Sequence, residues 1–212
     1  MSFSPSDRDA FLGQAMPPLL GNVLCLDFVN TLNPRTGRPV DFLRCYTDLL
    51  VWAYKEKLIL KSHAAALHEH AQADPSEAEA VFSKALEFRE TIYQIFFALA
   101  RGLEPTKRDL GSLRNLYAEA VIHSTLQLGG FRWVEQSNEL SQILWPVADS
   151  AITLLRHGER ARLKECANHS TCGWLFYDTT KNNGRRWCSM QDCGNQEKVR
   201  LQRKRRQKRA IP

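Results

Sequence analysis

Four of the six cysteines of this 212-residue chain gather near its C-terminal end, with the spacing Cys-x5-Cys-x15-Cys-x4-Cys. Thiolates are soft ligands, and two close pairs joined by a loop can converge into the tetrahedral site that zinc prefers. Because four protein ligands leave no coordination position for water or substrate, the expected ion is structural and not catalytic. We therefore predict one structural Zn²⁺ held by Cys166, Cys172, Cys188 and Cys193.

The segment between the second and third cysteines supports this convergence. Residues 173–177 and 185–187 are rich in aromatic residues and predict two strands, and the polar residues 178–184 between them predict a loop. A hairpin of these strands would bring Cys172 beside Cys188, as in a zinc-ribbon-like finger. So small a core would take much of its folding free energy from the metal.

The charge of the chain is unevenly distributed. The whole sequence carries 29 basic and 23 acidic residues, but residues 159–212 alone hold fourteen basic and five acidic ones, so the preceding part is mildly acidic. Eight basic residues and no acid fall in 198–209. A basic run beside a zinc module favours a polyanionic partner, and DNA is the partner we expect.

We assign two groups of side chains to a nucleic-acid interface. Residues of the tail would contact phosphates, which position a protein without reading base sequence, whereas residues beside the finger could read bases. For the two adjacent arginines, contact with phosphate and stacking on a nearby tryptophan are equally open. The tail group is Arg200, Arg203, Lys204, Arg206 and Lys208, and the group beside the finger is Arg185, Arg186, Asn195, Gln196 and Lys198.

Other partners stay open as alternatives. The chain could be a zinc-dependent protein–protein adaptor or bind RNA. The basic tail could also be a solvated segment that only aids solubility. Salt separates these cases, because binding through phosphates weakens steeply as salt rises and an apolar protein interface does not. A membrane partner is not expected, since few apolar side chains of the tail could insert.

Apolar periodicity predicts a mainly helical N-terminal domain, residues 1–158, ahead of the finger and basic helix in 159–212. Asp41 and Ser76 are predicted N-caps. The alternating residues 124–134 predict a small β-hairpin around two glycines, because tight hairpin turns need positive φ. The predicted helices of this domain are 21–32, 42–60, 62–73, 76–101, 105–119 and 138–157.

Three polar residues interrupt apolar stretches of the N-terminal domain. Asp27 and Asn30 lie in the string Leu-Asp-Phe-Val-Asn-Thr, and Arg89 lies within the longest predicted helix. A buried charge needs a partner, so Asp27 and Arg89 are predicted to pair. The alternative is a pocket in which Asp27, Asn30 and Arg89 bind a small polar effector.

Patterns typical of enzymes do not occur in this sequence, which holds no glycine-rich phosphate loop and no serine nucleophile elbow. No apolar run comes near the length of about 20 residues that crosses a bilayer. The first residues do not resemble a secretory signal, so a reducing compartment is expected. We therefore expect a cytoplasmic protein that is not an enzyme, and its oligomeric state is open, a homodimer included.

Two stretches resemble a known family. Residues 166–198, with the strings Trp-Leu-Phe-x-Asp and Arg-Arg-Trp-Cys-Ser-Met, are similar to the CGNR zinc finger, and residues 26–31 resemble the ABATE domain that precedes that finger. Together the resemblance covers nearly the whole chain. It implies a stress-induced transcriptional regulator with a sensor-like helical domain, a DNA-binding finger and four cysteine ligands. The family's Arg after Cys-Gly-Asn is Gln196 here, which would remove a charge-assisted contact if that Arg touches nucleic acid.

Overall fold

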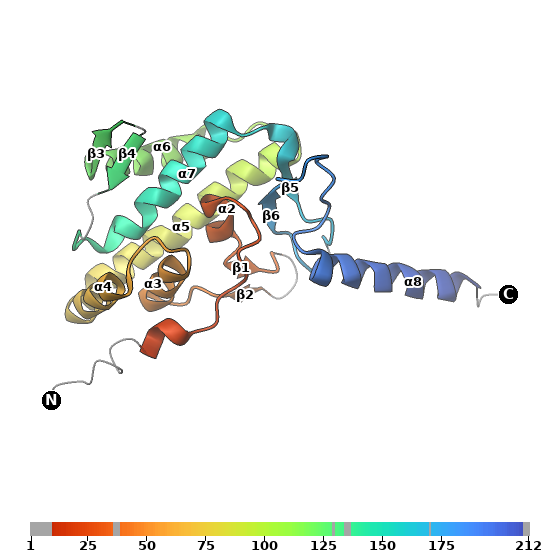
Figure 1. The fold of residues 1–212 in the computed structure, drawn as a ribbon, viewed down its shortest axis with the longest axis horizontal. Coiled ribbons are helices and arrows are strands. Elements are labelled where there is room, and N and C mark those ends of the chain that lie inside the picture. Colours follow the sequence, from red (N-terminus) through yellow and green to blue (C-terminus); the bar gives the residue numbers. More distant parts are fainter. Residues whose placement is uncertain (1–9, 36–38, 129, 134–136, 170, 210–212) are drawn as a thin grey trace.

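The computed structural model describes residues 10–35, 39–128, 130–133, 137–169 and 171–209, with side chains as far as Arg203. Within these residues the fold is mainly helical, with β-hairpins of two antiparallel strands and short 3-10 or π-helical turns marked η (Figure 1). In chain order the elements are η1 (Ala10–Gly13), α2 (Leu24–Val29), β1 (Leu32–Asn33), β2 (Val40–Asp41), α3 (Tyr46–Lys55), α4 (Lys61–Ala73), α5 (Pro75–Ala100), α6 (Lys107–Ile122), β3 (Ser124–Gln127), β4 (Gly130–Trp133), η2 (Leu140–Ile143), α7 (Leu144–His157), η3 (Arg160–Arg162), β5 (Leu163–Glu165), β6 (Leu175–Tyr177), η4 (Met190–Gly194) and α8 (Asn195–Arg209).

The long helix α5 runs through the middle of the molecule (Figure 1). Helices α2, α3, α4 and α6 pack against it, and α7 packs against α2 and α6. The face of α5 that these helices cover repeats at helical spacing, which is why a single helix can organise one continuous core. Its buried apolar residues are Ala78, Phe82, Ala85, Phe88, Ile92, Ile95, Phe96 and Leu99.

The predicted helices and the hairpin at 124–134 are confirmed, although Gly129 and residues 134–136 lie outside the described residues. Two predicted N-caps are wrong. The cap of α5 is Asp74, whose Oδ1 accepts a hydrogen bond from the Glu77 backbone N–H at 2.9 Å, because Pro75 begins the helix with its fixed φ. The cap of α3 is Cys45, so that helix starts later than predicted and leaves Asp41 in a strand.

The finger begins on the core of the helical domain. Strands β5 and β6 pair with each other, and their residues Leu163 and Leu175 belong to the main apolar core. The Asn30 side chain completes the edge of this hairpin: its Nδ2 donates to the Leu175 carbonyl at 2.9 Å, and its Oδ1 accepts from the Leu175 N–H at 3.1 Å. The predicted boundary near residue 158 therefore divides the chain between α7 and β5 without dividing the core.

Helix α8 points away from the rest of the molecule (Figure 1). It continues directly from η4, the turn against which it packs. The basic tail is thus held at its first turn by the finger, and its side chains from Lys198 to Arg203 are exposed.

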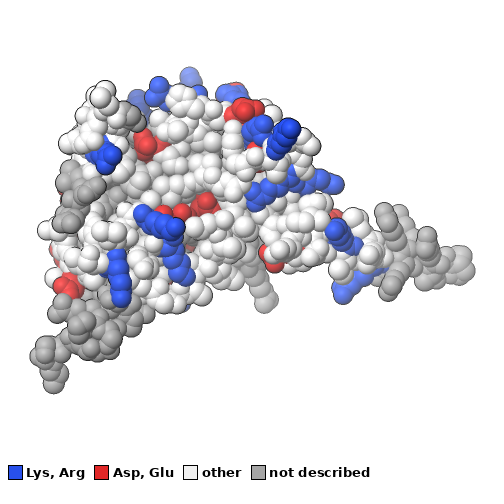
Figure 2. All heavy atoms as spheres, in the orientation of Figure 1, with Lys and Arg blue, Asp and Glu red and all other residues white. Residues whose placement is uncertain are grey.

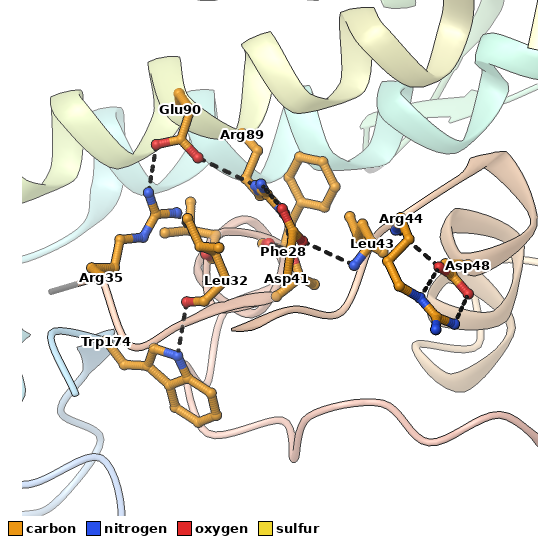
Figure 3. Close-up of polar contacts among 12 residues, drawn as sticks. Phe28, Leu32, Arg35, Asp41, Leu43, Arg44, Asp48, Arg89, Glu90 and Trp174 are labelled. Atoms are coloured by element: carbon orange, nitrogen blue, oxygen red, sulfur yellow. Dashed lines mark hydrogen bonds and ion pairs between the residues drawn. The ribbon is translucent and has the colours of Figure 1, made fainter. Parts of the chain in front are cut away.

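A buried arginine joins α5 to the first hairpin. The side chain of Arg89 is 4% exposed, and its Nη1 and Nη2 donate to the two carboxylate oxygens of Asp41 at 2.7 and 2.6 Å (Figure 3). Its Nη1 also donates to Thr31 Oγ1 at 3.2 Å, and its Nε lies 3.3 Å from Glu90 Oε1. The predicted pairing of Arg89 with Asp27 is therefore wrong, because the two-residue strand β2 delivers a nearer carboxylate in the fork geometry that a guanidinium matches.

We predict that Asp41→Asn lowers the free energy of unfolding by about 3 kcal/mol, since it removes the bidentate carboxylate of a buried guanidinium and leaves only the longer ion pair with Glu90. Urea denaturation of the full chain measures this. Glu104→Gln is the matched control, because Glu104 pairs with Arg160 and both side chains are more than half exposed, so its loss should cost less than about 1 kcal/mol. Equal effects of the two substitutions would contradict the role given to Asp41.

Candidate zinc centre and nucleic-acid interface

The four cysteines predicted as ligands come together. Their Sγ atoms all lie within 4.8 Å of one another, and all four residues are buried. The Cys188 Sγ lies 3.6 Å from the sulfurs of both Cys172 and Cys193. Four sulfurs at about 2.3 Å from one zinc ion would be about 3.8 Å apart, so the observed spacing fits a single tetrahedral Zn²⁺.

The pKa values of these thiols also favour a bound cation. Hydrogen bonds from Cys172 and the other neighbouring thiols lower the pKa of Cys166. The hydrogen bond between the Cys188 and Cys166 side chains raises the pKa of Cys188. Without a cation the four sulfurs cannot all carry negative charge in so small a volume. A divalent ion removes this conflict by stabilising all four thiolates.

Local backbone structure fixes the position of the ligands. Cys166 follows β5, and its N–H donates to the Trp174 carbonyl at 2.8 Å. Gly173, directly after Cys172, has a φ of 94°, a conformation that residues with a side chain rarely adopt. The Cys188 N–H donates to the Cys166 sulfur at 3.4 Å, which ties the second pair of ligands to the first.

The fourth ligand, Cys193, lies in the π-helical turn η4. The turn is capped by Ser189, whose Oγ accepts from the Asp192 N–H at 3.1 Å. Because α8 begins one residue after η4 ends, zinc binding by Cys193 fixes the start of α8.

One part of the predicted finger is wrong. Residues 185–187 do not form a strand with 173–177; β6 pairs with β5 instead. A buried carboxylate, Asp178, organises the loop between β6 and Cys188. It accepts hydrogen bonds from Lys164 Nζ at 2.7 Å and from the backbone N–H groups of Thr180 and Arg185 at 2.9 and 2.8 Å.

Burial by itself would raise the pKa of Asp178, but the hydrogen bonds from Lys164, Thr180 and Arg185 outweigh it and lower that pKa. The carboxylate therefore stays ionised and holds the loop that carries Cys188. Sequence reasoning missed this role, although the aspartate was visible as the last residue of the string Trp-Leu-Phe-x-Asp.

The two adjacent arginines have different environments. Arg185 is part of the finger: its guanidinium donates to the backbone carbonyls of Leu20, Trp187 and Cys188 and lies 4.3 Å from the centre of the Phe176 ring. Its predicted contact with nucleic acid is therefore not supported. Arg186 is exposed, with its guanidinium carbon 5.0 Å from the centre of the Trp187 ring, and keeps its charge available to a phosphate.

The predicted base-reading residues are partly engaged within the finger. Gln196 Oε1 accepts from Asn168 Nδ2 at 3.1 Å and from Thr171 Oγ1 at 3.2 Å, and Asn195 Nδ2 donates to the Gln191 carbonyl at 2.8 Å. A bidentate contact with adenine needs both ends of an amide. The two bonds that Gln196 Oε1 accepts use its acceptor end, whereas the single bond that Asn195 donates leaves its Oδ1 and one N–H without a partner among the described residues.

The basic residues of α8 are exposed where they are described. These are Lys198, Arg200 and Arg203, and Figure 2 shows basic side chains along this part of the helix. Arg200 pairs with Glu197 through its Nε at 2.6 Å, which offsets part of its charge. The side chains of Lys204, Arg206 and Lys208 lie outside the described part of the chain, although α8 continues through these positions.

The predicted effector pocket of Asp27, Asn30 and Arg89 does not form. Asp27 Oδ1 accepts from the Gly21 N–H at 2.7 Å, and burial raises the pKa of this carboxyl to about 6. Asn30 is bound to Leu175 and Arg89 to Asp41, as described above. The three polar groups thus bind separate partners and do not converge on a ligand.

These features define a class: a mainly helical protein that carries a four-cysteine zinc finger and a projecting basic helix. Comparison with family models agrees. Residues 22–158 match the ABATE model, described as "Putative stress-induced transcription regulator", and residues 162–206 match the CGNR zinc finger. The chain belongs to the ABATE family and carries a CGNR zinc finger. No curated protein matches it.

We predict that the purified chain contains one zinc ion. Elemental analysis by mass spectrometry should give one zinc per chain, and Cys188→Ser with Cys193→Ser should abolish it, because two thiolates do not fill a tetrahedral site. Cys25→Ser is the matched control, since Cys25 is a buried cysteine of α2 that does not belong to the cluster. Stoichiometric zinc in the double variant would refute this site.

We predict that Gln196→Arg destabilises the first turn of α8, because arginine cannot accept the hydrogen bonds from Asn168 and Thr171. The loss should be about 1 kcal/mol. Amide hydrogen exchange in residues 195–199 of the zinc-loaded chain measures it. Gln196→Glu keeps an acceptor at this position and should leave the exchange rates close to those of the original chain; equal acceleration in both variants would contradict the role of the acceptor.

Proposed function

We propose that this protein is a DNA-binding transcriptional regulator in which the zinc finger presents the basic helix α8 to the duplex. The observation that carries the proposal is the placement of α8. This helix starts directly after η4, the turn that contains the zinc ligand Cys193, and projects from the molecule with its described basic side chains exposed (Figure 1). A rigid base spares the helix part of the ordering entropy that a free tail would lose on binding.

The chemistry of the interface favours phosphates over bases. Exposed Arg186, Lys198 and Arg203 are charged donors, and such residues position a protein on DNA without reading sequence. Within the finger, Asn195 already donates a hydrogen bond through its side-chain nitrogen, and Gln196 already accepts one through its side-chain oxygen. We therefore expect a modest base preference and a strong dependence on salt.

Other parts of the proposal follow from the same features. A site closed by four thiolates gives a metal no open position, so we propose a role without enzymatic activity. Thiols that must stay reduced suit the cytoplasm, and among the described residues no helix is long and apolar enough to cross a membrane. A homodimer stays a prediction, as does a small-molecule effector at some site of the helical domain.

The test is the salt dependence of binding to a random-sequence DNA duplex. If about five phosphates are contacted, log K should fall with log salt at a slope of about −4 to −5. Deleting residues 200–212 leaves Arg186 and Lys198, so it should flatten the slope to about −2 and weaken binding to all sequences alike. Lys107→Gln with Arg108→Gln removes two exposed charges at the start of α6, outside the finger and α8, and should leave the slope unchanged.

An unchanged slope after the deletion would show that α8 does not contact phosphates and would overturn the proposal. Competition with a single-stranded RNA of the same length separates the alternative, because preference for RNA at matched salt would replace DNA as the partner. Binding of neither at low salt would leave the protein–protein adaptor as the function to pursue.

A further inference from the structure

A cavity of about 740 Å³ lies at the end of the helical domain away from the finger. Its walls come from the start of α4, strand β4 and the turn from η2 into α7. This volume is within the range that drug-sized ligands occupy in proteins. None of the residues considered above for zinc or DNA lines it.

The wall of the cavity combines aromatic surface with a few polar groups. Exposed Phe131 and half-buried Trp133 supply the accessible aromatic surface, and Trp145, which is 1% exposed, lies behind it in the wall. Such a mixture of apolar lining and sparse polar atoms is typical of small-molecule sites. A flat apolar body would bury surface against these rings without needing many hydrogen bonds.

One buried and one half-buried polar group of the wall offer acceptors. Gln142 is 8% exposed, and its Nε2 donates to the carbonyls of Ser137 at 2.5 Å and Glu139 at 2.9 Å, so its Oε1 is the end left without a donor among the described residues. His63 Nε2 lies 3.0 Å from the Ser137 carbonyl. Because a carbonyl only accepts, this nitrogen carries the hydrogen, and Nδ1 of the neutral ring is an acceptor.

The exposed side of the cavity carries a positively charged side chain. Arg132 lines it, is exposed, and pairs with no acidic side chain among the described residues. The site thus presents acceptors where it is buried and a guanidinium where it meets solvent. A guanidinium binds a carboxylate through two parallel hydrogen bonds.

We propose that this cavity binds a small aromatic carboxylic acid with a hydroxyl group on its ring system. The ring would lie among Phe131, Trp133 and Trp145, the hydroxyl would donate to Gln142 or His63, and the carboxylate would meet Arg132. This site differs from the predicted pocket of Asp27, Asn30 and Arg89 in every residue. It does not depend on whether α8 binds DNA.

The test is isothermal titration calorimetry of the full, zinc-loaded chain with a hydroxynaphthoate as probe. Saturable binding at one site per chain is expected. The neutral amide of the probe should bind about tenfold more weakly, since it loses a charge-assisted contact. Arg132→Gln should weaken the acid by a similar factor and leave the amide unaffected, whereas Arg108→Gln, an exposed arginine on α6, should change neither.

A second variant tests the cavity itself. Ala66 lines the cavity on the exposed face of α4, so Ala66→Phe fills the cavity without entering the core. It should weaken the probe more than about tenfold. Ala73→Phe, at an exposed position of the same helix, is the matched control. Absence of saturable binding to the original chain, or equal affinity in Ala66→Phe and Ala73→Phe, would overturn the proposal.

Discussion

Four thiolates can lie within a few ångströms of one another only if a cation neutralises their charge. The whole C-terminal part of this molecule depends on that condition. The ligands come from the end of β5, the turn before β6, the loop after Asp178 and the turn η4. Binding one zinc ion fixes all four segments at once. Since α8 starts where η4 ends, the same ion also fixes the origin of the basic helix.

The finger is nevertheless not a separate body. Its hairpin contributes Leu163 and Leu175 to the core of the helical domain, and Asn30 pairs with the backbone of Leu175 as a neighbouring strand would. The N–H of Arg35 donates to the carbonyl of Cys172, a zinc ligand, at 3.0 Å, while the Arg35 side chain pairs with Glu90 on α5 (Figure 3). The direction of α8 is therefore set by the helical domain as much as by the metal.

This connection bears on how a ligand in the helical domain could reach the finger. One wall of the cavity comes from the start of α7; α7 packs on α2, and α2 packs on β6. These are packed elements without a flexible linker between them. A change in the position of α7 would therefore act on the hairpin that carries the zinc site, provided that these elements have two discrete arrangements.

The sequence by itself determined the chemistry: the spacing of Cys166, Cys172, Cys188 and Cys193 defines a closed thiolate site, the charge of 198–209 favours a polyanion, and apolar periodicity predicts the helices. These are local properties of composition and spacing. Pairing between distant residues is decided by which groups the packed fold brings together. Only the tertiary structure paired Arg89 with Asp41, paired β6 with β5 and placed Arg185 over the ring of Phe176. The reason is that a buried charge such as that of Arg89 takes the partner that packing brings to it.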